Sequence, residues 1–141
     1  MASFNKVQDF IRAVFEGEHV LSTAGHTLKI MLTNVAPTAT GVTIKANITE
    51  IATGNGYVAG GLDIENTGSE TAGTYTIGAT DKTWTATGGA IAQFRYVVLY
   101  NDTPTSPADP VIGWWDYGSA VDLSAGETFT TDFGATVLTA S

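Results

Sequence analysis

Short strand-forming segments recur about every ten residues along most of this chain, and no other feature of the sequence restricts the fold as much. The segments are rich in Val, Ile, Thr and aromatic residues, and Gly, Pro, Asn or Asp separates each from the next. This spacing is typical of β-sandwiches and β-barrels. We therefore predict an all-β fold, a β-sandwich of about eight strands for which a jelly roll is one candidate arrangement. The predicted strands are residues 28–33, 62–64, 74–77, 83–87, 92–100, 111–117, 121–123, 127–133 and 136–139.

One predicted strand differs from the others in its pattern. Residues 94–100 are apolar at both odd and even positions apart from Arg95, so this strand should be covered on both faces and lie at the centre of a sheet. Its expected partner is 111–117. The connecting loop, residues 101–110, contains Pro104, Pro107 and Pro110, which cannot extend a sheet. We expect this loop to stand off the body as an exposed lobe.

The amino-terminal segment follows a different period. Its large apolar residues recur at helical spacing, with Ser3 as a candidate N-cap and Gly17 as a candidate stop. A short amphipathic helix is the favoured interpretation, and a strand or an arm swapped onto a neighbour is the alternative, because Val, Ile and Phe also form strands. The predicted organisation is thus an N-terminal helix or arm, residues 1–25, followed by one β-sandwich domain, residues 26–141. The helical face comprises Phe4, Val7, Phe10, Ile11, Val14 and Phe15.

The charge composition restricts the partners. The formal net charge is −8, yet only 14% of the residues are charged, against roughly 25% in typical soluble domains. The six Lys and Arg residues form no cluster, so a nucleic-acid partner is not expected. A surface of Thr, Ser and Gly loses its water cheaply, which suits assembly with other proteins. No apolar run approaches the roughly 18 residues of a membrane span, and we expect no membrane association.

Metal sites are not expected from the residues present. Cysteine is absent, which removes disulfides and thiolate ligands. His19 and His26 have only Glu16 and Glu18 as nearby carboxylates, and a helix end and a glycine-containing loop separate the two rings, so nothing should fix them on one side. Solvated loop histidines are the favoured interpretation.

Two further ligand classes are considered and disfavoured. The glycine-rich stretch 54–61 is not followed by a helix and has no Lys after a Gly, so close backbone packing explains it better than a phosphate loop. Calcium would need regularly alternating oxygen ligands, and the residues of the proline loop lack that alternation. Capping of turns is the favoured role of Asn101, Asp102 and Asp109.

Catalysis is also not expected. A glycosidase needs two carboxylates about 5 to 10 Å apart, and Trp114, Trp115 and Tyr117 would supply a sugar platform. The alternative is that Trp114 and Trp115 occupy opposite faces of one strand, one in the core and one at a surface. No nucleophile, base and orienting group can be assembled, so we predict a non-enzymatic protein without cofactors. The candidate carboxylates are Asp116, Asp122, Glu127 and Asp132.

Several stretches carry a resemblance to a family. They are residues 50–61 (EIATGNGYVAGG), 94–102 (FRYVVLYND) and 112–118 (IGWWDYG), together with the opening Phe4, Asn5, Lys6 and the strand 28–34. In these the chain resembles small structural proteins encoded among the virion genes of tailed bacteriophages. The resemblance implies a virion component assembled in the host cytoplasm, with a capsid decoration or cement protein as the leading assignment. A tail or adsorption component that binds host surface carbohydrate is the alternative.

The resemblance also implies partners, namely the major capsid protein or other virion proteins. We expect a homo-oligomer, with a trimer favoured at a capsid threefold axis, because closed symmetry satisfies the same patch on every copy. The predicted contacts are apolar residues of the N-terminal segment, the two tryptophans of the predicted strand 111–117, and two prolines of the loop 101–110. The candidate interface is Phe4, Val7, Phe10, Ile11, Trp114, Trp115, Pro104 and Pro107.

Overall fold

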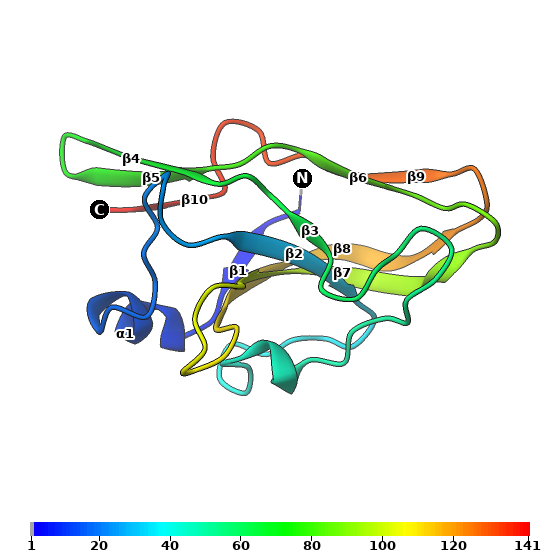
Figure 1. The fold of residues 1–141 in the computed structure, drawn as a ribbon, viewed down its shortest axis with the longest axis horizontal. Helices are drawn as coiled ribbons and strands as arrows, with labels where there is room; N and C mark the ends of the chain where they lie inside the picture. The colour runs from blue at the N-terminus through cyan, green and yellow to red at the C-terminus, as the bar shows by residue number, and fades with distance from the viewer. Residues whose placement is uncertain (1) are drawn as a thin grey trace.

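Antiparallel β-strands stacked in two layers form most of the structure, a computed structural model in which residues 2–141 are described (Figure 1). The predicted all-β sandwich with one short helix is confirmed. Met1, the first residue of the predicted 1–25 segment, lies outside the described residues. The elements are β1 (Phe4–Lys6), α1 (Asp9–Phe15), β2 (Leu28–Thr33), the 3-10 helix η1 (Lys45–Asn47), β3 (Leu62–Asp63), β4 (Thr67–Thr71), β5 (Thr74–Gly78), β6 (Lys82–Thr85), β7 (Ile91–Asn101), β8 (Val111–Leu123), β9 (Thr128–Thr131) and β10 (Leu138–Ala140).

The larger layer is a five-stranded sheet in the order β1-β8-β7-β2-β3. Its two longest strands, β7 and β8, form a hairpin in which Val97 lies opposite Trp115. On its other side β7 pairs with β2, where Leu99 lies opposite Ile30. The central position of 94–100 and its pairing with 111–117 are therefore confirmed. Arg95 is the one residue between Phe94 and Asn101 that is not buried.

The second layer consists of two smaller sheets, β10-β5-β4 and β6-β9, which lie end to end above the first layer in Figure 1. The core fills the space between the layers. Phe94 of β7 meets Phe129 of β9 edge to face, with 4.9 Å between the ring centroids. Trp115 of β8 contacts Phe133, which follows β9, at 5.6 Å.

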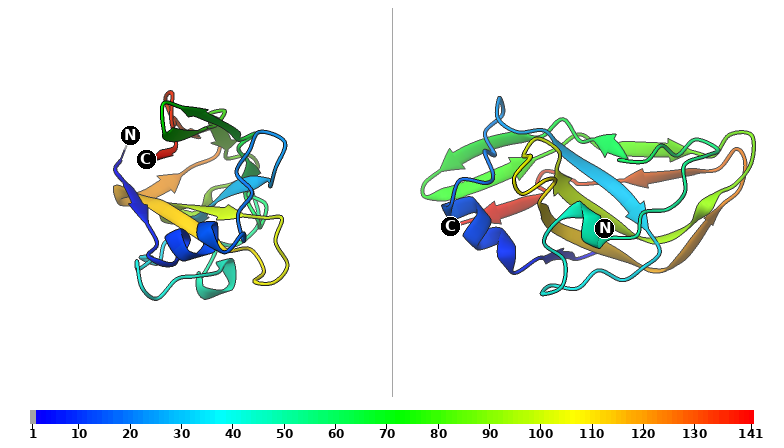
Figure 2. Two further views of the ribbon diagram at one scale, coloured as in Figure 1. Left: turned by 90° about the vertical axis from the view of Figure 1, so that its left-hand side faces the viewer. Right: turned by 60° about the horizontal axis from the view of Figure 1, so that its bottom comes forward.

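The outer face of the five-stranded sheet is covered as well. Residues 34–50, including η1, cross this face beside α1 and the proline loop (Figure 2, left). Backbone hydrogen bonds hold the covering segment in place, since Lys45 donates to the Asp109 carbonyl at 2.9 Å and Val111 donates to the Thr43 carbonyl at 2.9 Å. Both faces of β7 are consequently covered, which explains why it has apolar residues at odd and even positions alike.

The glycine-rich stretch is tied tightly to β2 and β7. The Tyr57 hydroxyl donates to the Glu50 carboxylate at 2.6 Å and accepts the Leu32 N–H at 3.0 Å. The Tyr100 hydroxyl donates to the Gly60 carbonyl at 2.6 Å. Gly61 has a φ of +71°, and a Cβ there would overlap the backbone of β2. The predicted close backbone packing is confirmed.

The N-terminal segment forms a short strand, β1, and then a short helix, α1, so both the strand and the helix considered for it occur. Phe4–Lys6 pair with the otherwise free edge of β8 as β1, so the helix does not begin after Ser3. It begins at Asp9, with Gln8 at the N-cap position, and ends before Gly17, whose φ of +81° suits glycine. The strand forms because its backbone groups find partners on β8. Val7 and Phe10 are buried in the common core, which makes this segment part of the body.

The proline loop is exposed only in part. Thr105, Ser106 and Ala108 at its tip are exposed, whereas Pro104 and Pro107 are half-buried. The base of the loop is attached to residues 43–45 through backbone hydrogen bonds, so the loop does not stand entirely clear of the body.

Candidate functional site

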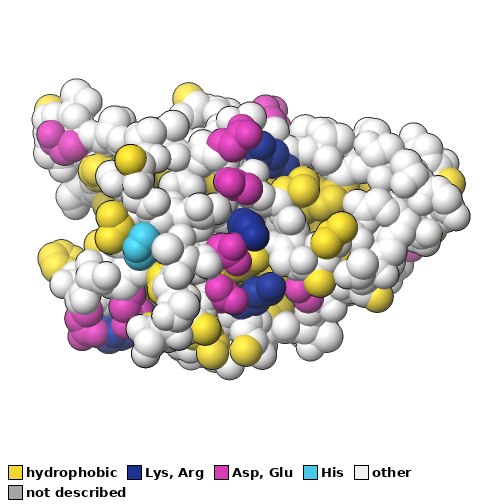
Figure 3. Space-filling view, viewed as in Figure 1, with side chains coloured by type: hydrophobic (Ala, Val, Ile, Leu, Met, Phe, Trp, Pro, Cys, Tyr) yellow, Lys and Arg dark blue, Asp and Glu magenta, His cyan; other side chains and the backbone are white. Residues whose placement is uncertain are grey.

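An apolar cleft opens at one end of the sandwich, between α1 and the β10-β5-β4 sheet. Its volume is ≈ 500 Å³. Figure 3 shows it as a notch at the left-hand end of the molecule, bordered by hydrophobic side chains between the β4–β5 hairpin and α1. One wall is formed by α1, and the other includes Tyr75 and Ile77 of β5 and Leu138 of β10. The lining is mostly apolar, with Glu70 the only acidic side chain in it.

The α1 wall is unusual in its exposure. Phe15 is 87% exposed, Ile11 44% and Val14 37%, although all three are large apolar side chains. The helical repeat explains the arrangement, because Phe10 and Ala13 face the core while Ile11, Val14 and Phe15 follow on the adjacent side of the helix. A contiguous exposed apolar surface of this kind is typical of a protein interaction site.

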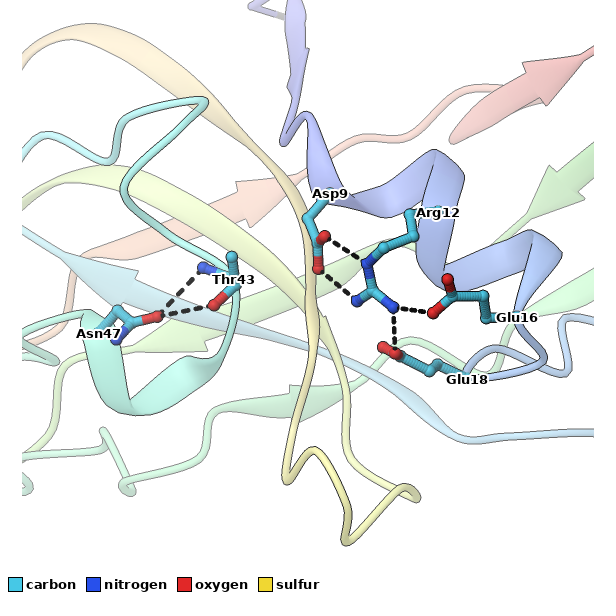
Figure 4. Close-up of polar contacts among 6 residues, drawn as sticks. All are labelled: Asp9, Arg12, Glu16, Glu18, Thr43 and Asn47. Atoms are coloured by element: carbon cyan, nitrogen blue, oxygen red, sulfur yellow. Dashed lines mark hydrogen bonds and ion pairs between the residues drawn. The ribbon is translucent and has the colours of Figure 1, made fainter.

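A charged cluster occupies another side of α1 (Figure 4). The Arg12 guanidinium donates to both carboxylate oxygens of Asp9, at 2.7 and 2.8 Å, to Glu18 at 2.8 Å, and to Glu16. Hydrogen bonds to these carboxylates raise the pKa of Arg12, and the Arg12 hydrogen bond lowers the pKa of Asp9. The cluster links the helix to the following loop and leaves no free cation on it.

His19 and His26 are brought together, contrary to the sequence-based expectation. The Asn101 side-chain amide donates to Nδ1 of His19 at 3.0 Å and to Nδ1 of His26 at 2.9 Å. Nδ1 of each ring is therefore the acceptor, and a neutral His19 ring carries its proton on Nε2, a buried atom without a hydrogen-bond partner. Burial lowers the pKa of His19 to about 4, so the ring is neutral at pH 7. Asn101 thus fixes the loop between α1 and β2 to the end of β7.

Metal ligation is not supported by this arrangement. Within residues 2–141, no group of three or more His, Cys, Asp or Glu side chains is placed to hold a metal ion. The calcium candidates serve as turn and surface groups: Asn101 accepts the Thr103 N–H at 3.2 Å, and Asp102 pairs with Lys29 at 2.8 Å.

The candidate catalytic carboxylates are each engaged locally. Asp116 forms a two-point ion pair with Arg95, at 2.8 and 3.0 Å, which lowers the pKa of Asp116. Asp122 accepts from Gln93 at 3.0 Å. Glu127 and Asp132 accept backbone N–H groups two or three residues away, each at 2.8 Å. The geometry assigns no acid, base or nucleophile among them.

Trp115 and Tyr117 do share one groove, which lies where β8 faces β9. It has a volume of ≈ 350 Å³, and Phe129 and Asp132 also line it. Trp115 is buried whereas Tyr117 is 57% exposed, so Tyr117 is the accessible ring. Trp114 lies on the other face of β8 and is half-buried, as the alternating arrangement of adjacent strand residues requires.

The predicted interface residues differ in their exposure to solvent. Val7, Phe10 and Trp115 are buried in the protein's own core, although Phe10 borders the cleft and Trp115 borders the groove. Phe4, Trp114, Pro104 and Pro107 are half-buried, and Ile11 is exposed and lines the cleft. Val14 and Phe15 were part of the predicted helical face but not of the predicted interface.

Among residues 2–141, no helix has the length and apolar character needed to cross a membrane. Comparison with known proteins adds no assignment. No protein-family model, no curated protein and no solved structure matches this chain significantly.

Proposed function

We propose that this chain is a non-enzymatic protein-binding protein, and that it is a structural component of a tailed-bacteriophage virion that decorates and stabilises the head lattice. The observation that carries the proposal is the exposed apolar wall of α1, formed by Ile11, Val14 and Phe15, beside the ≈ 500 Å³ cleft. A protein in solution rarely retains such a wall unless a partner covers it. The sequence resemblance supplies the partner, a capsid or other virion protein.

The surface composition supports attachment by many weak contacts. Few charged groups lose their water when this surface is buried, so the desolvation cost of each contact is small. Copies that present the same cleft around a capsid symmetry axis would gain affinity together. A homotrimer at a threefold axis remains our expected assembly.

Rebinding to stripped particles tests the role of the cleft. Phe15→Ser should weaken binding at least tenfold, because a large exposed ring in a protein contact contributes strongly to affinity. Val58→Ser is the matched control, since Val58 is also an exposed apolar residue, at 67%, but does not line the cleft. Cosedimentation would measure both variants. Equal binding of Phe15→Ser and the unaltered chain would refute the role of the cleft.

An electron-microscopy map of the particle tests the location. Density for this protein on the head lattice is expected, and density at the tail alone would support the alternative assignment.

The second candidate function is carbohydrate binding by a tail or adsorption component. The groove that brings Trp115 and Tyr117 together with Asp132 favours it, because an aromatic ring beside a carboxylate can pack on a sugar and accept its hydroxyl groups. A glycan array distinguishes this function. A signal that is lost in Tyr117→Ala would support it, and no signal would remove it.

A further inference from the structure

The cleft beside α1 contains a buried hydrogen-bond donor that the protein leaves without a partner. His19 lines the cleft although its side chain is only 6% exposed. Its Nδ1 accepts from the Asn101 amide at 3.0 Å, whereas its Nε2 has no hydrogen-bond partner within residues 2–141. A buried donor without a partner is costly, because it has lost its water and gained nothing in return. A ligand that accepts a hydrogen bond from this atom would recover that cost.

The setting of the His19 ring turns this donor towards the cleft. The Nδ1 edge of the ring faces Asn101, which is not part of the cleft lining. The Phe10 ring, which does line the cleft, lies beside His19 with 5.2 Å between the ring centroids. The edge that carries Nε2 lies opposite Nδ1 and is the edge left to border the cleft. Because Nε2 is itself buried, a ligand must displace the surrounding side chains slightly to reach it.

The charges around the cleft favour a neutral ligand over an anionic one. Glu70 lines the cleft, and none of the described lining residues is Lys or Arg. Asp9 and Glu18 add negative charge near His19, and both already share the Arg12 guanidinium. A carboxylate or phosphate would therefore lose its water without gaining a cation, whereas a carbonyl oxygen needs only a donor.

The strand beside the cleft favours a peptide among neutral ligands. Leu138 and Ala140 of β10 line the cleft, and β10 is an edge strand that pairs with β5 alone among the described strands. An extended peptide can pair its main-chain groups with such an edge and direct alternate side chains towards apolar walls. A lipid acyl chain has no groups for that pairing. The volume of ≈ 500 Å³ is within the range of ligand-binding clefts.

We propose that the cleft binds an extended apolar peptide segment of a partner protein, and that one main-chain carbonyl of this segment accepts a hydrogen bond from Nε2 of His19. The inference rests on the proposed function, since it specifies which part of a partner the cleft recognises. Apolar side chains of the segment pack between Phe15 of α1 and Ile77 of β5, and the bond to His19 fixes the position of the segment along the cleft.

A small neutral probe tests the site on the unaltered full chain. N-acetyl-leucyl-leucinamide has apolar side chains and main-chain carbonyls but no charge, and decanoate is the acyl chain for comparison. Nuclear magnetic resonance of protein with isotope-labelled histidine reports on the ring nitrogens. We expect the dipeptide to shift the Nε2 signal of His19 more than that of His26. Binding of decanoate without binding of the dipeptide, or dipeptide binding that leaves the His19 signals unchanged, would overturn the proposal.

A pair of variants tests the hydrogen bond. His19→Phe keeps an apolar ring of similar size but removes the donor, so the dipeptide should bind at least about fivefold more weakly. His26→Phe is the matched control, because His26 accepts from the same Asn101 amide at 2.9 Å but does not line the cleft. It should bind the dipeptide as the unaltered chain does. Equal affinities of the two variants would contradict the proposal, and if His19→Phe fails to fold, the resonance measurement on the unaltered chain decides.

Rebinding to stripped particles separates this inference from the proposed function. If Phe15→Ser weakens rebinding but His19→Phe weakens neither rebinding nor dipeptide binding, the inference is wrong and the proposed function stands. If dipeptide binding depends on His19 but rebinding depends on neither Phe15 nor His19, the cleft is a peptide site and the proposed attachment to the capsid is wrong.

Discussion

Gly61 and Gly88 have similar left-handed backbones, with φ of +71° and +76°, but different surroundings. A Cβ at Gly61 would overlap the Ile30 carbonyl of β2, whereas a Cβ at Gly88 would meet nothing within 4 Å. We expect Gly88→Ala to cost about 1 to 2 kcal/mol of the free energy of unfolding, the penalty of the backbone conformation alone. Gly61→Ala should cost about 3 kcal/mol or more, because β2 must also move. Urea denaturation of both variants measures the difference, and equal losses would contradict the packing argument.

His19 should give the protein a defined pH dependence. Its pKa is about 4 in the folded state, because of burial, and 6.5 in the absence of a shift. Between these values the unfolded chain binds the proton and the folded chain does not, so the stability falls as the pH decreases from 6.5 towards 4. The contribution of this group is roughly 3 kcal/mol at most.

The variant His19→Asn isolates this contribution. Its side-chain oxygen can still accept from the Asn101 amide, but it cannot take up a proton. Glu18, His26 and Asp9 surround the ring in both proteins, so their own effects are shared. Unfolding in urea at pH 7 and pH 4.5 should show a smaller loss of stability for the variant. An identical loss would show that His19 does not titrate as its burial implies.

At the scale of elements, Tyr57 joins the glycine-rich stretch to β2. Tyr57→Phe removes the hydroxyl that satisfies both the buried Leu32 N–H and the Glu50 carboxylate. A loss of about 1 to 3 kcal/mol is expected, since a buried donor is left without a partner. Tyr117→Phe, at an exposed ring, is the matched control and should change the stability by less than about 0.5 kcal/mol. Thermal unfolding compares the two, and similar shifts would refute the anchoring role.

The strands that were predicted well from the sequence are those whose residues are mostly buried. β2 and β7 were predicted within a few residues because burial demands an apolar pattern. β4 was missed, since Thr67–Thr71 is a mainly exposed run of polar residues that forms a strand only by pairing with β5. The predicted strands 111–117 and 121–123 are one strand, β8, because pairing with β7 continues past Gly118, with register shifts between them.

The cleft could not be predicted from local pattern. Its walls come from α1, β5 and β10, which are distant in sequence and meet only in the folded chain. The helical period did predict an apolar face including Val14 and Phe15. The helical period could not show which part of that face remains exposed, because this depends on where the helix begins. Phe4–Lys6 form β1 and are not part of the helix.

At the scale of the whole molecule, the two layers leave one end and one edge incompletely covered. The cleft opens at the end, beside α1, and two smaller hollows open along β1, where both border Phe4. Both openings border the N-terminal segment, which therefore has two separable parts. Residues 2–6 contribute one half-buried ring, whereas residues 7–15 contribute Val7, Phe10 and Ala13 to the core.

Two truncations separate these parts. Removal of residues 1–6 should leave a folded protein with a modest loss of stability, because the pairing of β8 with β7 is untouched. Removal of residues 1–15 should cost about 3 to 6 kcal/mol from the loss of Val7 and Phe10 alone, each of which contributes about 1.5 to 3 kcal/mol when fully buried. That is a large part of the stability of a typical domain, so cooperative unfolding should be weakened or absent. Circular dichroism and urea denaturation measure both proteins. A longer truncation that unfolds as cooperatively as the full chain would show that α1 is dispensable for the core.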